Sequence, residues 1–347
     1  MGGRMRAWLI EKVGPIEEQS QPLQNREVAD PEASSNELII RVSVCGICHT
    51  ELDEIEGRTP PPRFPMIPGH QVVGRVEVIG KSVTRYQTGD RVGVGWIFSA
   101  CGTCDACLAG NENLCSRFRA TGRDHFGGYA ELMSVPEKYA FPVPEIFKDE
   151  EAAPLLCAGA IGYRSLRLTG LTDGQRLGLT GFGASGHLVL MLSRFQFPHS
   201  DVCVFARSER ERELAMELGA VWVGDTTDRP PELCDAIIDT TPVWKPVVEA
   251  LRCLAPGGRL VINAIRKETS DQDDLLRLNY SDHLWMEKEI KSVANVARRD
   301  IAEFLEIAGK IPLRPKVQIY PFEDANKALV DLKAGRIHGA KVLKILS

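Results

Sequence analysis

The sequence has no apolar run long enough to cross a lipid bilayer, which takes about 20 residues. Its longest apolar stretch, residues 152–163, is interrupted near its start by Pro154. The N-terminus places only four apolar residues, 7–10, before Glu11, too few for a secretory signal peptide. We therefore expect a cytoplasmic protein with no membrane partner.

Neither sign of charge is in large excess. The 42 Lys and Arg residues against 47 Asp and Glu residues leave a net charge of −5, which produces no field that would favour nucleic acid as a partner. Internal repeats and low-complexity tracts are also lacking. With 44% hydrophobic and 26% charged residues the chain is globular, and its 347 residues suggest two domains.

The chain shows two kinds of hydrophobic pattern, one in each part, and together they indicate an α/β protein. Up to about residue 155 short alternating runs, such as 37–44 and 72–79, lie between turn residues, as in a β-rich domain. Beyond it six short apolar segments alternate with helical patterns, which predicts a doubly wound parallel sheet. The six predicted strands are 176–180, 201–205, 221–223, 235–239, 259–263 and 289–293. Near the C-terminus, Asp300 followed by Glu303 predicts a capping box that opens a helix ending at Gly309.

Four cysteines, Cys101, Cys104, Cys107 and Cys115, lie close together on one loop. In a reducing compartment such cysteines indicate a metal site before they indicate disulfides. Four thiolates close a tetrahedral structural Zn²⁺ site and leave no position for water. An iron–sulfur cluster is the alternative, since bacterial ferredoxins share the first two spacings, but their fourth cysteine comes sooner and precedes proline.

A second set of soft ligands is scattered along the chain: Cys48, His70 and Cys157. Each alone is unspecific, and His70 or Cys157 could equally be structural. Together they supply two sulfur atoms and one nitrogen, the pattern of a catalytic zinc with one open position. Cys45 forms a C-x-x-C with Cys48, but a thioredoxin-like site would need that motif beside a βαβ unit.

A glycine motif, G-F-G-A-S-G at 181–186, follows the first predicted strand of the parallel sheet and precedes an apolar run. This context makes it a dinucleotide-binding fingerprint, in which Gly181, Gly183, Ala184 and Gly186 form a tight turn against a pyrophosphate. A glycine-rich turn in an α/β domain that binds no nucleotide is the alternative.

These motifs, in this order, resemble the zinc-dependent alcohol dehydrogenases of the medium-chain dehydrogenase/reductase superfamily over essentially the whole chain. The resemblance rests on C-H-T-E at 48–51, G-H-Q-V-V-G at 69–74, the cysteine loop, A-A-P-L-L-C at 152–157 and the glycine motif. The branch it is most similar to contains the cinnamyl and broad-range alcohol dehydrogenases. The resemblance implies a GroES-like catalytic domain at 1–155, completed by 295–347, and a Rossmann domain at 156–294.

The resemblance also implies roles for individual residues. Cys48, His70 and Cys157 match the ligands of catalytic zinc, and the cysteine loop matches structural zinc, so we expect two Zn²⁺ per chain. Thr50 matches the hydroxyl that takes the alcohol proton. His49 matches a residue near the cofactor pyrophosphate, and Trp96 falls where the family has an aromatic wall of the substrate pocket. A homodimer or homotetramer is implied as well.

Four positions depart from the family pattern. Gln71 stands in place of glutamate beside the ligand histidine, and Glu51 in place of the aspartate that orients it. Asp53 stands where many members have a relay histidine, so that protons leave through water or through Asp53 itself. Ala340 stands where some members have an arginine near the cofactor phosphates, although Lys341 is adjacent.

The end of the second strand indicates which cofactor is used. An NAD-binding fingerprint usually places a carboxylate there, about 20 residues after the glycines, to hold the ribose 2′-hydroxyl. In this chain the position is Ala206, followed by Arg207 and Ser208, which suit a 2′-phosphate. We therefore favour NADP(H), with NAD(H) as the alternative, because Glu209 and Glu211 are close by.

The predicted reaction is hydride transfer between a primary or secondary alcohol and the nicotinamide, with reduction of an aldehyde or ketone in reverse. Two other functions stay open. One is a zinc-free reductase of quinones or enones from the same superfamily, and the other is a non-enzymatic dinucleotide-binding protein whose zinc is structural only.

Overall fold

A computed structural model describes residues 3–311, 313–336 and 339–346. Within it the chain forms two compact units, one of residues 1–157 and 296–347 and the other of residues 158–295. The first unit is therefore built from both ends of the chain. In the part that the structure describes, no helix combines the length and the apolar character needed to cross a membrane.

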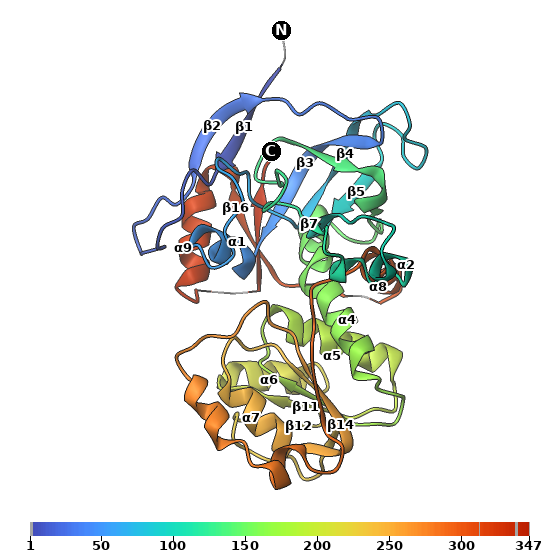
Figure 1. The fold of residues 1–347 in the computed structure, drawn as a ribbon, viewed down its shortest axis with the longest axis vertical. Helices are drawn as coiled ribbons and strands as arrows, with labels where there is room; N and C mark the ends of the chain where they lie inside the picture. The colour runs from blue at the N-terminus through green and yellow to red at the C-terminus, as the bar shows by residue number, and fades with distance from the viewer. Residues whose placement is uncertain (1–2, 312, 337–338, 347) are drawn as a thin grey trace. The chain divides into compact units, whose positions relative to one another are not determined.

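The first unit is a β-rich domain around a seven-stranded sheet of order β16-β17-β3-β4-β5-β9, with β8 paired to β3 (Figure 1). Only β16 and β17 are parallel to each other. Its strands are β1 (Arg4–Leu9), β2 (Gln24–Ala29), β3 (Glu37–Ile47), β4 (Val72–Ile79), β5 (Arg91–Val94), β6 (Ile97–Ser99), β7 (Arg119–Ala120), β8 (Leu132–Pro136), β9 (Ala140–Pro142), β16 (Val317–Pro321) and β17 (Ala340–Lys344). The alternating runs predicted at 37–44 and 72–79 are the core strands β3 and β4.

Helical segments connect these strands, and several of the predicted site residues lie in them or directly next to them. They are α1 (His49–Ile55), α2 (Asp105–Leu108), η1 (Glu112–Leu114), η2 (Glu137–Tyr139), α3 (Asp149–Ala152), η3 (Ala153–Leu156), α8 (Arg298–Ala308), η6 (Phe322–Asp324) and α9 (Ala325–Lys333). Helix α8 begins earlier than predicted, with Ala297 as its N-cap and Asp300 as its third residue. The Asp300 carboxylate accepts from the Ala297 amide at 2.8 Å, so Asp300 caps the helix from the third position and the predicted N-cap position was wrong.

The second unit is a doubly wound α/β domain with a six-stranded parallel sheet of order β12-β11-β10-β13-β14-β15. The strands are β10 (Leu177–Thr180), β11 (Val202–Phe205), β12 (Trp222–Gly224), β13 (Cys234–Asp239), β14 (Leu254–Ile262) and β15 (Glu289–Ser292). All six correspond to predicted strands. This order reverses between β10 and β13, which creates the switch point at which Rossmann folds bind dinucleotides.

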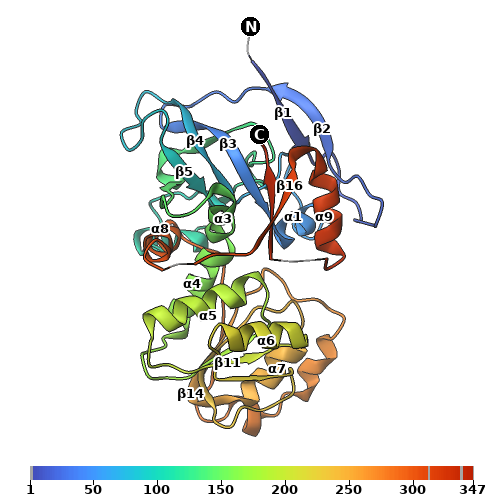
Figure 2. The ribbon, with the colours of Figure 1, turned by 180° about the vertical axis from the view of Figure 1, so that it is seen from behind.

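Helices cover the sheet of the second unit, and Figure 2 shows α5 and α6 in front of its strands. The helical segments are α4 (Ala158–Thr169), α5 (Ala184–Gln196), α6 (Glu209–Glu217), α7 (Lys245–Arg252), η4 (Gln272–Arg277) and η5 (Tyr280–Leu284). Strands β11, β13 and β14 bury Cys203, Cys234 and Leu260 against Val247 and Leu251 of α7. Burial of such apolar side chains is the main source of stability for this sheet.

Candidate metal and dinucleotide sites

The structure brings Cys48, His70 and Cys157 together within the first unit, although they are far apart in the sequence. Cys48 precedes α1, His70 lies on the connection that leads into β4, and Cys157 follows η3. His70 Nε2 lies 3.5 Å from Cys48 Sγ and 3.4 Å from Cys157 Sγ. All three ligand atoms lie within 4.8 Å of one another.

These distances suit one tetrahedral zinc ion. With Zn–S near 2.3 Å and Zn–N near 2.05 Å, the sulfur and nitrogen corners of a tetrahedron are about 3.6 Å apart. Three protein ligands of this kind leave the fourth position open. The donor set therefore fits a zinc ion that also binds a small molecule.

A buried carboxylate orients the histidine of this set. Glu51 Oε1 lies 2.7 Å from His70 Nδ1, so the other ring nitrogen, Nε2, points to the two sulfur atoms. The second oxygen of Glu51 accepts from the amide of Cys48 at 2.8 Å. Burial lowers the pKa of His70, but the charges of Glu51 and Cys48 outweigh burial and leave the pKa well above its usual value. One glutamate thus holds two of the three ligands, although it is a methylene longer than the family's aspartate.

The other departures in this region are also buried. Gln71 packs on Gly46, where a Cβ would lie 2.6 Å from Gln71 Oε1, and the backbone carbonyl of Gln71 accepts from the amide of Gly46 at 2.8 Å. Asp53 accepts from Arg58 Nε at 2.5 Å, and its side chain is 4% exposed.

Three further predicted residues belong to the same unit: His49, Thr50 and Trp96. His49 and Thr50 form the start of α1, directly after Cys48, and the Thr50 amide donates to Cys48 Sγ at 3.3 Å. Trp96 lies between β5 and β6 with its ring centroid 5.2 Å from that of Phe118. The preceding residue, Gly95, is so close to the segment before Cys157 that a Cβ would lie 3.1 Å from the Leu156 carbonyl.

The four loop cysteines form a second centre. The ligand atoms of Cys101, Cys104, Cys107 and Cys115 all lie within 4.8 Å of one another, and Cys101 Sγ is 3.8 Å from Cys107 Sγ. That separation equals the sulfur–sulfur edge, about 3.8 Å, of a tetrahedral zinc–thiolate site. A four-iron cluster would hold the sulfur atoms further apart. The geometry therefore favours a single ion over the iron–sulfur alternative.

Backbone amides donate to two of these sulfur atoms and favour the thiolate state of Cys101. The amides of Thr103 and Cys104 donate to Cys101 Sγ at 3.4 and 3.3 Å, and the Arg117 amide donates to Cys115 Sγ at 3.3 Å. The bond from Thr103 contributes most to lowering the pKa of Cys101 to about 5. Because metal ions bind thiolates rather than thiols, these contacts favour metal binding.

The glycine motif lies where a dinucleotide-binding turn belongs, between β10 and α5. Gly181 has φ of +79°, which favours glycine, and a Cβ there would meet Thr240 Oγ1 at 2.8 Å. At Gly186 a Cβ would lie 2.7 Å from the Gly181 carbonyl, whereas at Gly183 nothing lies within 4 Å. Ala184 is the first residue of α5. The turn is therefore tight against the sheet and open at the helix N-terminus, as pyrophosphate binding requires.

The predicted 2′-phosphate region follows β11. Ala206 is buried and its amide donates to the Gly224 carbonyl at 2.9 Å, while Arg207 and Ser208 are exposed. Within the described residues the Arg207 guanidinium has no hydrogen-bond partner. Arg212 Nη1 donates to the carbonyls of Ala206 and Arg207 at 2.7 and 2.9 Å. The sequence analysis missed Arg212, which belongs to no motif and acts by fixing the backbone of this loop.

Lys341 is not available to a cofactor phosphate. It is 1% exposed, and its ammonium group donates to Gln318 Oε1, the Tyr320 hydroxyl and the Arg336 carbonyl at 2.8–3.0 Å. Lys341, the cation adjacent to Ala340, therefore has no donor left for a phosphate, since all three of its N–H groups are used.

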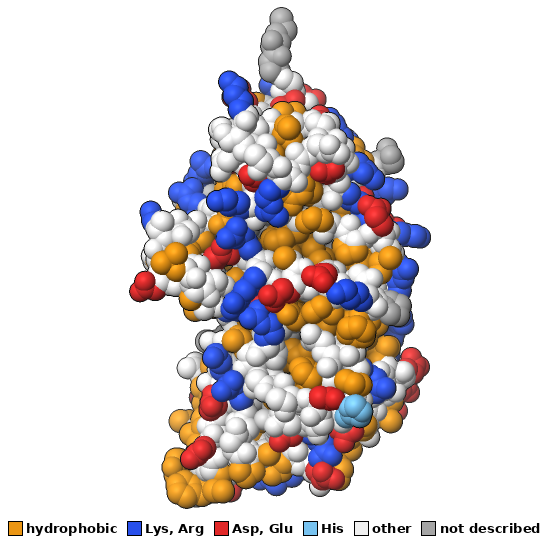
Figure 3. Space-filling model, turned by 90° about the vertical axis from the view of Figure 1, so that its right-hand side faces the viewer, with side chains coloured by type: hydrophobic (Ala, Val, Ile, Leu, Met, Phe, Trp, Pro, Cys, Tyr) orange, Lys and Arg blue, Asp and Glu red, His pale blue; other side chains and the backbone are white. Residues whose placement is uncertain are grey.

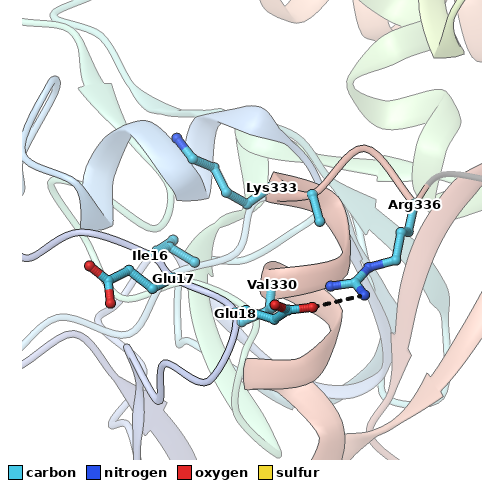
Figure 4. A pocket seen from close by; sticks show the side chains of 7 residues that line it. Ile16, Glu17, Glu18, Val330, Lys333 and Arg336 are labelled. Atoms are coloured by element: carbon cyan, nitrogen blue, oxygen red, sulfur yellow. Dashed lines mark ion pairs between the residues drawn. The ribbon is translucent and has the colours of Figure 1, made fainter.

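An open pocket in the first unit contains none of the predicted site residues (Figure 4). It is lined by Ile16, Glu17, Glu18, Val330, Lys333, Ala334 and Arg336. Arg336 pairs with Glu18 at 3.6 Å, and Lys333 pairs with Glu56 at 2.9 Å. Because both cations are paired with carboxylates, the pocket offers no strong anion site.

Comparison with known proteins agrees with this geometry. Residues 34–145 match the model of the alcohol dehydrogenase GroES-like domain. A probable alcohol dehydrogenase of Mycobacterium tuberculosis is 42% identical over 346 residues, covering 98% of this chain and 97% of the relative. An alcohol dehydrogenase of Geobacillus stearothermophilus is 33% identical, covering 96% of this chain and 99% of the relative.

The chain belongs to the zinc-type alcohol dehydrogenases of the medium-chain dehydrogenase/reductase superfamily. A solved cinnamyl alcohol dehydrogenase of Sorghum bicolor has the same fold, with a TM-score of 0.84 at 25% identity, covering 99% of this chain and 98% of that one. The alcohol dehydrogenase fold, with a GroES-like and a Rossmann domain, is thus confirmed. Oxidoreduction of alcohols and aldehydes with a nicotinamide cofactor is the reaction of this family.

Proposed function

We propose that Cys48, His70 and Cys157 hold the catalytic zinc of this alcohol dehydrogenase, with Glu51 orienting His70. The observation that carries the proposal is the close approach of His70 Nε2 to both sulfur atoms, 3.5 and 3.4 Å, opposite the 2.7 Å contact with Glu51. Zinc bound there supplies a Lewis acid that polarises the oxygen of a primary or secondary alcohol and lowers its pKa.

Thr50 is the proposed acceptor of the alcohol proton. A hydroxyl both donates and accepts, so Thr50 can take the proton and pass it on. Its position in the first turn of α1, two residues after Cys48, supports this role. His49, exposed and adjacent, is proposed to lie near the pyrophosphate of the cofactor.

The cofactor supplies the hydride acceptor, a nicotinamide ring, and the turn of Gly181, Gly183, Ala184 and Gly186 is proposed to bind its pyrophosphate. Ala206, Arg207 and Ser208 are proposed to surround the ribose 2′-position. The Arg207 guanidinium is exposed and pairs with no carboxylate among the described residues, which favours a 2′-phosphate, so NADP(H) is preferred to NAD(H), with Glu209 and Glu211 nearby as the basis of the alternative.

Cys101, Cys104, Cys107 and Cys115 are proposed to bind a structural zinc, giving two Zn²⁺ per chain. Trp96, with Phe118 beside it, is proposed to form one wall of the substrate pocket. The substrate is a small alcohol or aldehyde. Basic and acidic side chains are interspersed on the face shown in Figure 3, which offers no extended basic surface to nucleic acid.

A homodimer or homotetramer is proposed from the free edge of the Rossmann sheet. All four residues of β15 are exposed, and unpaired strand edges invite pairing with another chain. Ile290 in this strand is 45% exposed, and four apolar side chains in the segment before it are more than half exposed: Leu276, Tyr280, Trp285 and Met286. A cytoplasmic location is proposed because none of the ten cysteines forms a disulfide, as in a reducing compartment.

Removal of the metal tests the proposed function. Alcohol oxidation with NADP⁺ is measured before and after dialysis against a chelator, and circular dichroism shows whether the fold is kept. The proposal expects loss of activity with retained fold, and recovery when zinc is returned. Full activity in chelated, metal-free protein would instead indicate a zinc-free reductase, and no activity at any stage a non-enzymatic dinucleotide-binding protein.

A further inference from the structure

A buried carboxylate connects three segments at the carboxyl edge of the Rossmann sheet. Asp239, the last residue of β13, is fully buried. Its Oδ1 accepts from the Thr180 hydroxyl at 2.6 Å and from the Thr241 hydroxyl at 2.7 Å. Thr180 ends β10 and directly precedes Gly181, so the carboxylate holds the strand that leads into the dinucleotide turn.

Lys267 binds the other oxygen of this carboxylate from the connection that follows β14. Its ammonium group pairs with Asp239 Oδ2 and also donates to the carbonyls of Thr241 and Val243 at 2.8 and 2.9 Å. A lysine has three N–H donors, and all three are used. The Lys267 side chain is 8% exposed, so it is a structural cation that has no donor left for a ligand.

A second contact joins the carboxyl edge of the Rossmann sheet to the glycine turn. The Thr240 hydroxyl lies 3.0 Å from the Thr180 carbonyl and 3.3 Å from the Gly181 carbonyl. Residues 239–241 thus touch both the turn after β10 and the connection after β14. In doubly wound folds the ligand lies outside the carboxyl ends of the strands at the switch point, here between β10 and β13.

We propose that Asp239 and Lys267 form a cofactor-positioning pair. The pair holds the turn at 181–186 and the connections after β13 and β14 in their binding arrangement before a nicotinamide dinucleotide enters. This role rests on the proposed function, because it presupposes that the turn binds such a cofactor. Since the pair acts on the backbone near the switch point and not at the ribose 2′-position, it supports NADH and NADPH equally.

The variant Lys267→Met tests the proposal, because it keeps the length of the side chain and removes its charge. Dissociation constants for NADH and NADPH are measured by fluorescence on folded protein, without substrate. We expect both constants to rise about tenfold with their ratio unchanged, the size of effect seen for residues that act on a site without touching its ligand. Lys245→Met, at an exposed lysine of α7, is the matched control and should leave both constants unchanged.

Amide hydrogen exchange of the cofactor-free protein provides the second measurement. The proposal expects faster exchange at 180–186 and 263–268 in Lys267→Met, with the core of β10 and β11 unaffected; a general loss of stability would accelerate exchange throughout the unit. Should Lys267→Met not fold, Thr180→Val removes one hydrogen bond to Asp239 and should raise both dissociation constants in the same proportion.

Unchanged dissociation constants in a folded Lys267→Met protein would overturn the positioning role, and so would a change confined to one of the two cofactors. Failure of the proposed dinucleotide binding gives a different result, since the wild-type protein would then bind neither NADH nor NADPH.

Discussion

Glu51 Oε1 and His70 Nδ1 lie 2.7 Å apart, and neither side chain is more than 1% exposed. This contact leaves Nε2 as the ring nitrogen that faces the two sulfur atoms of the proposed zinc site. It also brings a negative charge close to the metal ligands, where Gln71 contributes none. Carboxylate–histidine–metal arrangements of this kind raise the basicity of the ligand and keep its ring in place.

The first prediction concerns this contact. Glu51→Gln keeps the shape but removes the charge, and we expect it to weaken zinc binding at the catalytic site about 10- to 100-fold. Competition with a zinc-binding dye measures the affinity. Glu51→Asp, the residue usual in the family, should weaken binding less. Equal zinc affinity in the wild type and in Glu51→Gln would contradict the orienting role.

The two metal sites should respond differently to the loss of one ligand. Cys104→Ala should lower the thermal stability markedly, because structural zinc contributes directly to the folding free energy. Cys157→Ala should abolish activity and leave the melting temperature nearly unchanged, because the proposed catalytic site has an open ligand position and is not a structural site. Thermal unfolding and steady-state activity of both variants check this. Full stability of Cys104→Ala together with full activity of Cys157→Ala would show that the two sites are wrongly assigned.

Thr50 is tested by a pair of substitutions. Thr50→Ala removes the hydroxyl and should lower kcat about 10²- to 10³-fold, within the usual contribution of proton transfer. Thr50→Ser retains the hydroxyl and should stay within about tenfold of the wild type. If the alanine and serine variants turn over equally fast, Thr50 takes no part in proton transfer.

Cofactor choice is tested at the end of β11. The wild type should have the higher kcat/KM with NADPH, and Ala206→Asp should shift the ratio toward NADH by at least about tenfold, or about 1.4 kcal/mol. The new carboxylate would repel a 2′-phosphate and accept from a 2′-hydroxyl. A wild-type preference for NADH, or an unchanged ratio in Ala206→Asp, would refute the assignment.

The sequence predicted the parts of the fold that depend on local patterns. Short apolar strands with helices between them favour a parallel sheet, and their local patterns placed all six Rossmann strands to within a few residues. The alternating runs became β3 and β4 for a similar reason. The cysteine loop and the glycine turn were predicted because their residues are close together in the chain.

Local sequence patterns could not predict the contacts between segments that are far apart in the sequence. Arg298 Nε binds Glu112 Oε1 at 2.6 Å and so fastens the cysteine-loop region to α8 across 186 residues of sequence. The contacts of Lys341 are a second case, because only the fold shows that Gln318 and Tyr320 use its donors. Asp239 ended a predicted strand, but nothing near it in the sequence indicated Lys267. The ligands Cys48, His70 and Cys157 were grouped by their donor chemistry and by the family resemblance, but only the fold shows that their ligand atoms lie within 4.8 Å of one another.

The zinc content of the purified protein tests the central claim most directly. Metal analysis of the wild type and of Cys157→Ala, normalised to protein concentration, counts the ions in each. The account predicts two zinc ions per chain in the wild type and one in Cys157→Ala, which keeps the structural site. One ion in the wild type, or two retained in an inactive Cys157→Ala, would contradict a catalytic zinc held by Cys48, His70 and Cys157.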